Sequence, residues 1–253
     1  MIPLKSGEFK KFSKDEFDKL EYFTYGIYRV KIDKSEDENI NRLFRFNNLN
    51  YYTHINITDA KKFGLKINLI EDEQANALMY SRDKCLRADQ IFKRFVDSLF
   101  EFKENKELEK DVRDYIKLII NRLWGALSET NEKRNIIERD SLIDFKLPKN
   151  YKVIQQKPSR NKNQIILDIA HNDNFYKNNY ARLKPFLIAK GRSVISNLMF
   201  PHKEFIKRCH TDGFISSKKL DIKTGNKLGD LVYEGYCENV IIKTNQKPEQ
   251  EFI

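Results

Sequence analysis

Apolar residues recur at helical spacing between Ala88 and Glu129, and this period constrains the fold more than any other feature of the sequence. The first run is marked by Ile91, Phe95 and Leu99. After a charged break at residues 103–110, the period continues through Val112, Ile116, Ile119, Leu123 and Leu127. A four-residue step of this kind is typical of amphipathic helices. The pattern therefore predicts two such helices, joined near residues 104–106, and core packing explains the apolar stripe itself.

Shorter β-branched and aromatic runs indicate strands on either side of the helical region. Five segments fit this pattern: 25–32, 43–46, 51–57, 66–70 and 164–169. Residues 58–64 read as a capped helical turn ending on Gly64, and residues 180–199 as a longer helix. Most of 130–178 is polar and reads as irregular, with a basic loop at 157–163. A short strand is expected at 240–242. Together these features predict an α+β fold.

Two mainly apolar runs flank Thr211-Asp212-Gly213, and this arrangement predicts a β-hairpin across residues 205–215. The prediction places the carboxylate of Asp212 at the tip of the hairpin. A carboxylate fixed on a tight turn can hold a hard divalent cation. Most Asp-Gly turns hold nothing, so the turn alone does not establish a metal site.

The charge balance favours a polyanionic partner. The 253 residues include 47 Lys and Arg against 37 Asp and Glu, which gives a formal net charge of +10. Such an excess attracts nucleic acid or anionic membranes, although a merely Lys-rich proteome would produce the same balance. Three cysteines without metal-ligand spacing favour a reducing compartment. With no signal-peptide core and no bilayer-spanning apolar run, we expect a soluble, intracellular protein that does not bind membranes.

On the second expected helix, Lys117, Asn121, Trp124 and Gly125 are spaced to share one face. A lysine can pair with phosphates, an asparagine can hydrogen-bond in the same pocket, and an aromatic ring can stack on a base. A glycine inside a helix costs about 1 kcal/mol relative to alanine, so it suggests the close approach of a ligand. The structural alternative is a surface lysine, a core tryptophan and a tolerated glycine.

Residues 117–127 resemble motif B of the family B DNA polymerases, a Lys followed by Asn-Ser-x-Tyr-Gly on the fingers helix. Residues 209–213 resemble motif C, Tyr-x-Asp-Thr-Asp-Ser, on the palm hairpin. The basic segment 181–192 lies between the two motifs, as it does in the family. The nearest likeness is to the protein-primed viral and organellar-plasmid branch, particularly the polymerases of large DNA viruses. The resemblance is strongest over 110–129 and 181–216.

This resemblance implies a DNA-directed DNA polymerase, which adds nucleotides to a primer 3′ end by a two-metal mechanism. It assigns Asp212 and Lys117 to catalysis, with Asp212 binding Mg²⁺. The nucleotide-binding residues would be Lys117, Asn121, Trp124 and Gly125. The DNA-binding residues would be Thr211, Lys227, Lys243, Arg182 and Arg192.

The resemblance also implies a division of the chain. Residues 1–80 would be an insertion subdomain after the motif A position, 81–129 the fingers, 130–178 a second insertion with a basic loop, and 179–253 the palm, with the thumb largely absent. His210 stands where the family usually has an acid, and neither motif A nor an exonuclease domain is found. We therefore expect the isolated chain to be nearly inactive.

The partners implied are template-primer DNA, deoxynucleotides, a separate chain carrying the exonuclease and motif A, and a terminal protein primer. The location implied is a viral replication site in the host cytoplasm or nucleus, or an organelle. The alternative is a noncatalytic nucleic-acid-binding or assembly subunit built on a decayed polymerase.

Overall fold

An antiparallel sheet forms the centre of the N-terminal part of the chain. The computed structural model describes residues 1–3 and 5–238. In this part of the chain the largest sheet has five strands in the order β2-β6-β3-β4, with β5 also paired to β3. Its strands are β2 (Glu8–Lys10), β3 (Gly26–Ile32), β4 (Tyr51–Thr53), β5 (Ile67–Leu69) and β6 (Ala77–Met79). Alternate residues of β3 are buried, so the sequence prediction of a strand with one core-facing side is confirmed.

Short helices pack beside this sheet: α1 (Lys14–Asp18), α2 (Glu38–Leu43) and α3 (His54–Lys62). Thr53 caps α3 by accepting a hydrogen bond from the backbone N–H of Asn56, and the Asn56 side chain bonds back to Thr53. The chain leaves α3 through Gly64, whose φ of +73° suits glycine. Nearby, β1 (Ile2–Pro3) pairs with β7 (Cys85–Leu86), which follows the 3₁₀ helix η1 (Arg82–Lys84).

Two strand predictions in this region need correction, and one helical prediction is confirmed except for its start. The expected strand at 43–46 is the end of α2 followed by an irregular segment, because Leu43 and Phe44 face the core rather than pair in the sheet. The expected strand at 51–57 ends at Thr53, where the capping residue starts a helix. The helical turn placed at 58–64 is therefore the second half of α3, and its cap is Thr53 rather than a residue of that turn.

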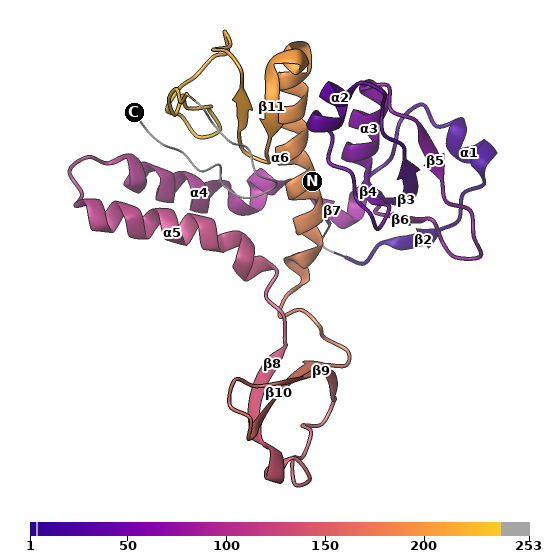
Figure 1. Cartoon of the computed structure of the whole chain (residues 1–253), viewed down its shortest axis with the longest axis vertical. Coiled ribbons are helices and arrows are strands. Elements are labelled where there is room, and N and C mark those ends of the chain that lie inside the picture. The colour runs from indigo at the N-terminus through magenta and orange to yellow at the C-terminus, as the bar shows by residue number, and fades with distance from the viewer. Residues whose placement is uncertain (4, 239–253) are drawn as a thin grey trace.

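Helices α4 (Ala88–Glu104) and α5 (Lys110–Leu127) confirm the pair predicted from the apolar period. They pack against each other and extend to one side of α6, while the N-terminal sheet lies on the other side (Figure 1). Helix α6 (Leu183–Met199) follows the 3₁₀ helix η3 (Asn179–Arg182) and is succeeded by η4 (Phe200–Phe205). The helix predicted at 180–199 is thus confirmed.

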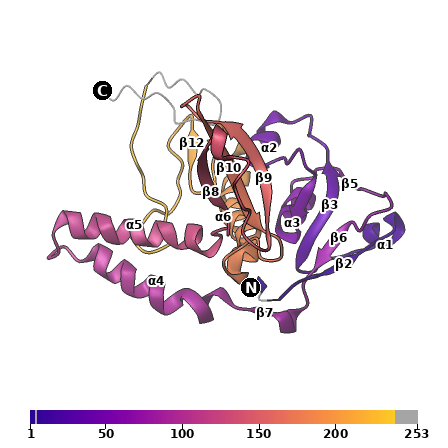
Figure 2. The same cartoon turned by 90° about the horizontal axis from the view of Figure 1, so that it is seen from below.

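Residues 130–178 form a three-stranded antiparallel sheet, which contradicts the prediction of a largely irregular region. The order is β8-β10-β9. The elements are β8 (Lys133–Glu138), the 3₁₀ helix η2 (Arg139–Ser141), β9 (Tyr151–Pro158) and β10 (Gln164–His171). Only β10, which the sequence did predict, has a well-buried side, with Ile165, Leu167 and Ile169. The sheet projects away from the rest of the molecule (Figure 1), and in the view from below it lies in front of α6 (Figure 2).

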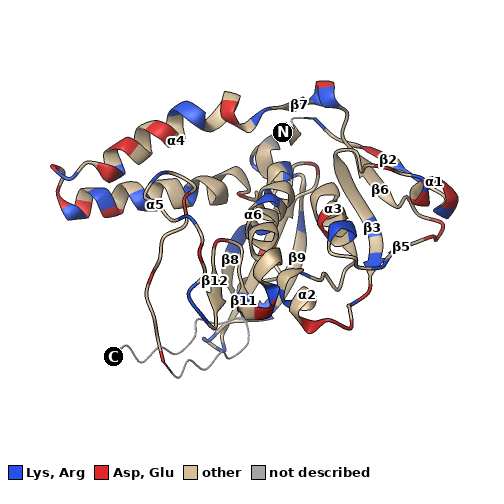
Figure 3. Cartoon of the chain, turned by 90° about the horizontal axis from the view of Figure 1, so that it is seen from above, with Lys and Arg blue, Asp and Glu red and all other residues tan. Residues whose placement is uncertain are grey.

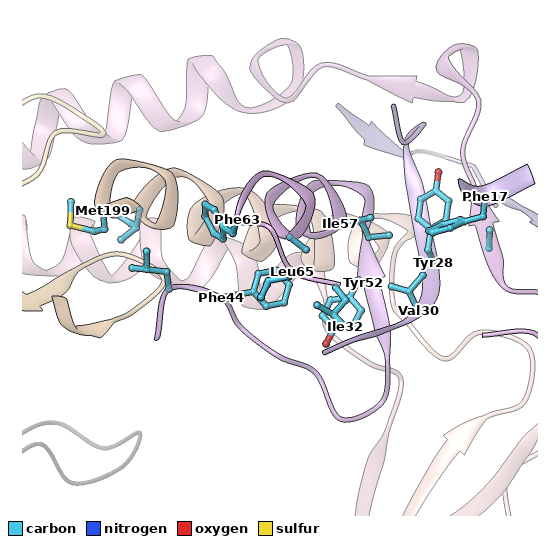
Figure 4. Packing of buried hydrophobic residues seen from close by; sticks show 14 of the residues in the cluster. Phe17, Tyr28, Val30, Ile32, Phe44, Tyr52, Ile57, Phe63, Leu65 and Met199 are labelled. Carbon is cyan, nitrogen blue, oxygen red and sulfur yellow. The ribbon is translucent and has the colours of Figure 1, made fainter. Parts of the chain in front are cut away.

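One hydrophobic core joins the N-terminal region to α6 and the hairpin that follows it. Ile195 and Met199 of α6 and Ile206 of the hairpin belong to the same buried cluster as the sheet residues Tyr28 and Val30 (Figure 4). Polar contacts reinforce this junction, because the buried carboxylate of Asp59 on α3 accepts hydrogen bonds from two residues of α6. These donors are Ser193 Oγ at 3.1 Å and Asn197 Nδ2 at 2.7 Å. The fold is α+β, as predicted, and residues 1–80 and 179–238 share its main core.

Candidate nucleic-acid interface

The candidate residues of α5 are unequally exposed. Lys117 and Asn121 are exposed, one helical turn apart, and neither side chain forms a hydrogen bond or ion pair with any described residue. Gly125 is also exposed, and a Cβ built there would meet no atom within 4 Å. The three residues therefore leave an open strip on this helix, with a cation and an amide free to bind a ligand.

Trp124 instead lies partly buried between α5, α4 and the start of α6. Its ring centroid is 5.6 Å from that of Phe92 on α4, with the planes inclined at 70°. Phe92 in turn makes an edge contact with Tyr180 at 6.3 Å. Trp124, Tyr180 and Leu187 are among the residues that line a small cavity of about 10 Å³. Trp124 thus packs the base of the α4–α5 pair, while its predicted contact with a nucleotide stays a prediction.

The predicted hairpin is present, with strands β11 (Ile206–Cys209) and β12 (Phe214–Ser216). The backbone N–H of His210 donates to the carbonyl of Gly213 over 2.7 Å, which closes the turn. Asp212 is exposed at this turn and has no hydrogen-bond or ion-pair partner among the described residues. Its carboxylate is therefore available to a cation or a donor from outside the hairpin.

Helix α6 contacts both the end of α5 and the hairpin turn, next to the two candidate motifs. Near its start, Lys184 Nζ donates to Ser128 Oγ at the end of α5 over 3.5 Å. Further along, Gly191 lies against the turn, where a Cβ would be 3.3 Å from Thr211 Cγ2. At 1.5 Å per residue, these two anchoring points lie roughly 10 Å apart along the helix. No hydrogen bond or ion pair among the described residues joins Lys117 or Asn121 directly to Asp212.

The residues present do not complete a site for a pair of magnesium ions. Mg²⁺ in phosphoryl-transfer sites is held by one or two carboxylates together with substrate oxygens. Within residues 1–3 and 5–238, no group of three His, Cys, Asp or Glu side chains gathers closely enough to hold a metal ion. Asp212 supplies one carboxylate at the turn, and the predicted binding of Mg²⁺ stays a prediction.

The predicted DNA-binding residues differ in their contacts and in their exposure to solvent. Arg182 donates to Ser6 Oγ over 3.2 Å and so ties η3 to the N-terminal segment. Arg192 is partly buried beside Gly191, and the pKa of its guanidinium is lowered, first by burial and then by the charge of Arg45. Lys227 is exposed in a turn, and its own backbone N–H donates to Asp230 Oδ2. Lys243, like the strand expected at 240–242, lies outside the described residues.

Charges of both signs are interspersed along α4 and the first turn of α5 (Figure 3). Beyond Asp114, the charged residues of α5 are Lys117 and Arg122, both basic. Arg45 and Tyr51, which no sequence motif marks, line an open groove of about 570 Å³ together with Arg192.

No helix in the described part of the chain combines the length and the apolar character needed to cross a membrane.

Comparison with known proteins yields one distant structural similarity. No family model matches the sequence, and no curated protein matches it. Among solved structures, the chain is similar to Phi29 DNA polymerase complexed with primer-template DNA and incoming nucleotide substrates, at 12% identity and a TM-score of 0.47. The similarity covers 85% of this chain but 35% of the polymerase chain, so this chain spans about a third of that protein. A likeness at this level establishes neither family membership nor activity.

Proposed function

We propose that this chain is the nucleotide- and DNA-binding part of a DNA-directed DNA polymerase of family B. The observation that carries the proposal is the joint anchoring on α6. The end of α5 is held by Lys184, and the turn bearing Asp212 rests on Gly191. Two segments that resemble polymerase motifs in sequence thus both contact one helix. The side chains of Lys117, Asn121 and Asp212 are exposed and have no hydrogen-bond or ion-pair partner among the described residues.

In this proposal the residues act mainly by positioning and by charge. Lys117 neutralises the phosphates of the incoming nucleotide, and Asn121 hydrogen-bonds within the same pocket. Asp212 contributes one carboxylate facing the primer end, and Thr211, Arg192 and Lys227 contact the DNA. The second carboxylate comes from a segment carrying motif A, whether on a partner chain or elsewhere in a longer product. Phosphoryl transfer depends on such positioning more than on covalent chemistry.

The finer features of the proposal follow from the sequence resemblance. They are membership of the protein-primed branch, use of a terminal protein as primer, and action at a viral replication site or in an organelle. The segments that support them are the motif-like runs at 117–127 and 209–213 and the basic segment between them.

The test is primer extension by the chain mixed with a separately expressed polypeptide that carries the Asp-x-x-x-x-Tyr-Pro strand. Magnesium-dependent extension should appear with the mixture. Asp212→Asn, which keeps the shape of the side chain, should lower extension by about a hundredfold or more. The matched control is Asp221→Asn, an exposed acid beyond the hairpin, which should leave extension unchanged. Extension that survives Asp212→Asn would overturn the proposed role of the hairpin.

A second candidate is a noncatalytic nucleic-acid-binding subunit. It is favoured by His210 in place of the usual acid and by the absence of a three-ligand cluster in the described residues. Labelled primer-template binding by fluorescence anisotropy separates the two functions. Intact DNA binding, with no extension in any mixture, would favour this subunit role over the polymerase.

A further inference from the structure

A polar groove runs between the segment 45–56 and helix α6, and it contains none of the α5 or hairpin candidates. Its volume is about 570 Å³, within the range of roughly 300–1,000 Å³ common for ligand sites. The wall from the N-terminal region includes Arg45, Asn48 and Tyr51, and the wall from α6 includes Ile188 and Arg192. Two segments about 140 residues apart in sequence therefore build one concave surface.

Both arginines of the groove lack a counter-ion. Arg45 is exposed and Arg192 is partly buried, and neither forms a hydrogen bond or ion pair with a described residue. The described residues that line the groove include no Asp or Glu. Positive charge from Arg45 adds to burial in lowering the pKa of Arg192. A partly desolvated cation beside a like charge is unfavourable unless an anion binds between them.

The wall that carries Arg45 and Tyr51 is held in place by its own hydrogen bonds. The backbone N–H of Asn47 donates to the hydroxyl of the buried Tyr52 over 2.7 Å, and Asn47 Nδ2 donates to the Tyr51 carbonyl over 2.8 Å. The backbone N–H of Val30 on β3 then donates to the carbonyl of Asn50 over 3.0 Å. A wall fixed in this way loses little conformational entropy on binding.

Tyr51 adds an apolar surface to this cationic groove. Half of its side chain is exposed, at 51%, although it belongs to β4 of the main sheet. The guanidinium of Arg29, paired with Asp72, lies 6.0 Å from the ring centroid. An exposed ring beside unpaired arginines is the combination with which proteins bind single-stranded nucleic acid, because phosphates meet the cations and a base stacks on the ring.

We propose that this groove binds a single-stranded segment of nucleic acid, with a phosphate between Arg45 and Arg192 and a base against Tyr51. An open groove suits a continuous strand better than a small molecule that must be enclosed. The inference goes beyond nucleotide addition, because it requires neither a bound nucleotide nor a second carboxylate. It shares Arg192 with the DNA contacts of the proposed function, but its binding test needs no polymerase activity and can fail while primer extension succeeds.

The test is the binding of a fluorescein-labelled single-stranded oligothymidine of about 12 nucleotides, measured by anisotropy across a salt series without nucleotide or Mg²⁺. The double variant Arg45→Gln/Arg192→Gln should weaken binding about tenfold or more. It should also reduce the slope of log affinity against log salt by about 0.7, the value expected when one phosphate contact on a single strand is lost. The charge-matched control is Lys14→Ala/Lys19→Ala, two exposed lysines at the start and just beyond the end of the distant helix α1. Its slope should stay near that of the unaltered chain.

The stacking contact has its own test. Tyr51→Ala should weaken binding about fivefold or more with little change in salt slope, whereas Tyr51→Phe should bind normally. Circular dichroism melting confirms that each variant is folded. Equal affinity of the arginine double variant and the lysine control would overturn the inference. Weaker oligothymidine binding by the arginine double variant together with no effect of Tyr51→Ala would also overturn it, because the groove would then be a general anion site.

Discussion

The backbone of Gly191 on α6 lies directly against Thr211 in the hairpin turn. A Cβ at position 191 would be 3.3 Å from Thr211 Cγ2 and 3.5 Å from the Thr211 carbonyl oxygen. The glycine costs helix stability, since it loses about 1 kcal/mol relative to alanine in a helix interior. The contact explains why it is present, because any larger residue pushes against the turn that carries Asp212.

The first prediction concerns this contact. Gly191→Ala should change the free energy of unfolding by less than about 1 kcal/mol, because the helix gain offsets a small shift of Thr211. Gly191→Leu should destabilise the chain by about 1–3 kcal/mol through overpacking. Urea unfolding measures both values. Equal stability of the leucine and alanine variants would show that the turn does not rest on α6.

The second prediction concerns the buried polar junction between α3 and α6. Ser193→Ala removes one of the donors to the Asp59 carboxylate, which is only 8% exposed. A buried charged acceptor that loses a partner costs about 1–3 kcal/mol of stability. Ser98→Ala on the exposed side of α4 is the control, and it should be neutral or slightly stabilising in the same urea experiment.

The third prediction concerns pH. His54 is packed against Tyr25 and Phe186, and burial lowers the pKa of its imidazole, with the N-terminal ammonium adding a smaller effect in the same direction. The unfolded chain therefore binds this proton more readily than the folded chain. Stability should be fully present above about pH 6.5 and should fall as the pH drops below that value.

The substitution His54→Phe tests this dependence, because it keeps a ring and removes the titration. Its stability should fall less between pH 7 and pH 5 than that of the unaltered chain, as measured by thermal melting. His202→Phe serves as a control histidine. Parallel losses in all three proteins would place the acid sensitivity elsewhere.

The fourth prediction concerns the exposed strip of α5. In the reconstituted enzyme, Lys117→Ala should raise the KM for deoxynucleotide about tenfold or more, because it removes a charge-assisted contact to phosphate. Lys106→Ala, in the loop between α4 and α5, removes the same charge away from the strip and should leave KM unchanged. Steady-state primer extension measures both, and a KM equal to that of the control would remove Lys117 from the nucleotide pocket.

The fifth prediction uses Trp124, the only tryptophan in the sequence. Its contact with Phe92 predicts that Trp124→Ala destabilises the chain by about 2 kcal/mol, below the cost of a fully buried tryptophan because the ring is only partly buried. Trp124→Phe should retain most of the stability. If the ring also borders the nucleotide, its fluorescence should change when deoxynucleotide is added. An unchanged signal with an intact fold would assign Trp124 to packing alone.

Strong local patterns made part of this fold predictable. The α4–α5 pair follows from an apolar period sustained over some forty residues, and the hairpin follows from a turn tripeptide between apolar runs. The sheet of β8, β9 and β10 was missed because β9 is largely exposed and carries no alternation of apolar and polar residues. Leu43 and Phe44 misled the strand assignment because a helix end and a strand both bury adjacent apolar residues.

The candidate site was predictable only where a motif is local. Residues 117–125 and 209–213 are short segments that can be recognised one at a time. The groove is different, because Arg45 and Arg192 come together only through the packing of the N-terminal sheet on α6. No short-range signal marks an arginine that lacks a counter-ion, so this surface emerges only from the three-dimensional arrangement.

The shared core has a consequence for how the protein is made. Leu43 and Ser196 are joined by a hydrogen bond that spans 153 positions of the chain, and the cluster around them closes only when β11 is present. At a synthesis rate of about 5–20 residues per second, the first aromatic residues wait roughly 10–30 seconds for their partners to leave the ribosome. During that interval Phe63 lacks Phe200, the ring on which it stacks in the folded chain. The nascent N-terminal region should therefore depend more on chaperones when translation is slower.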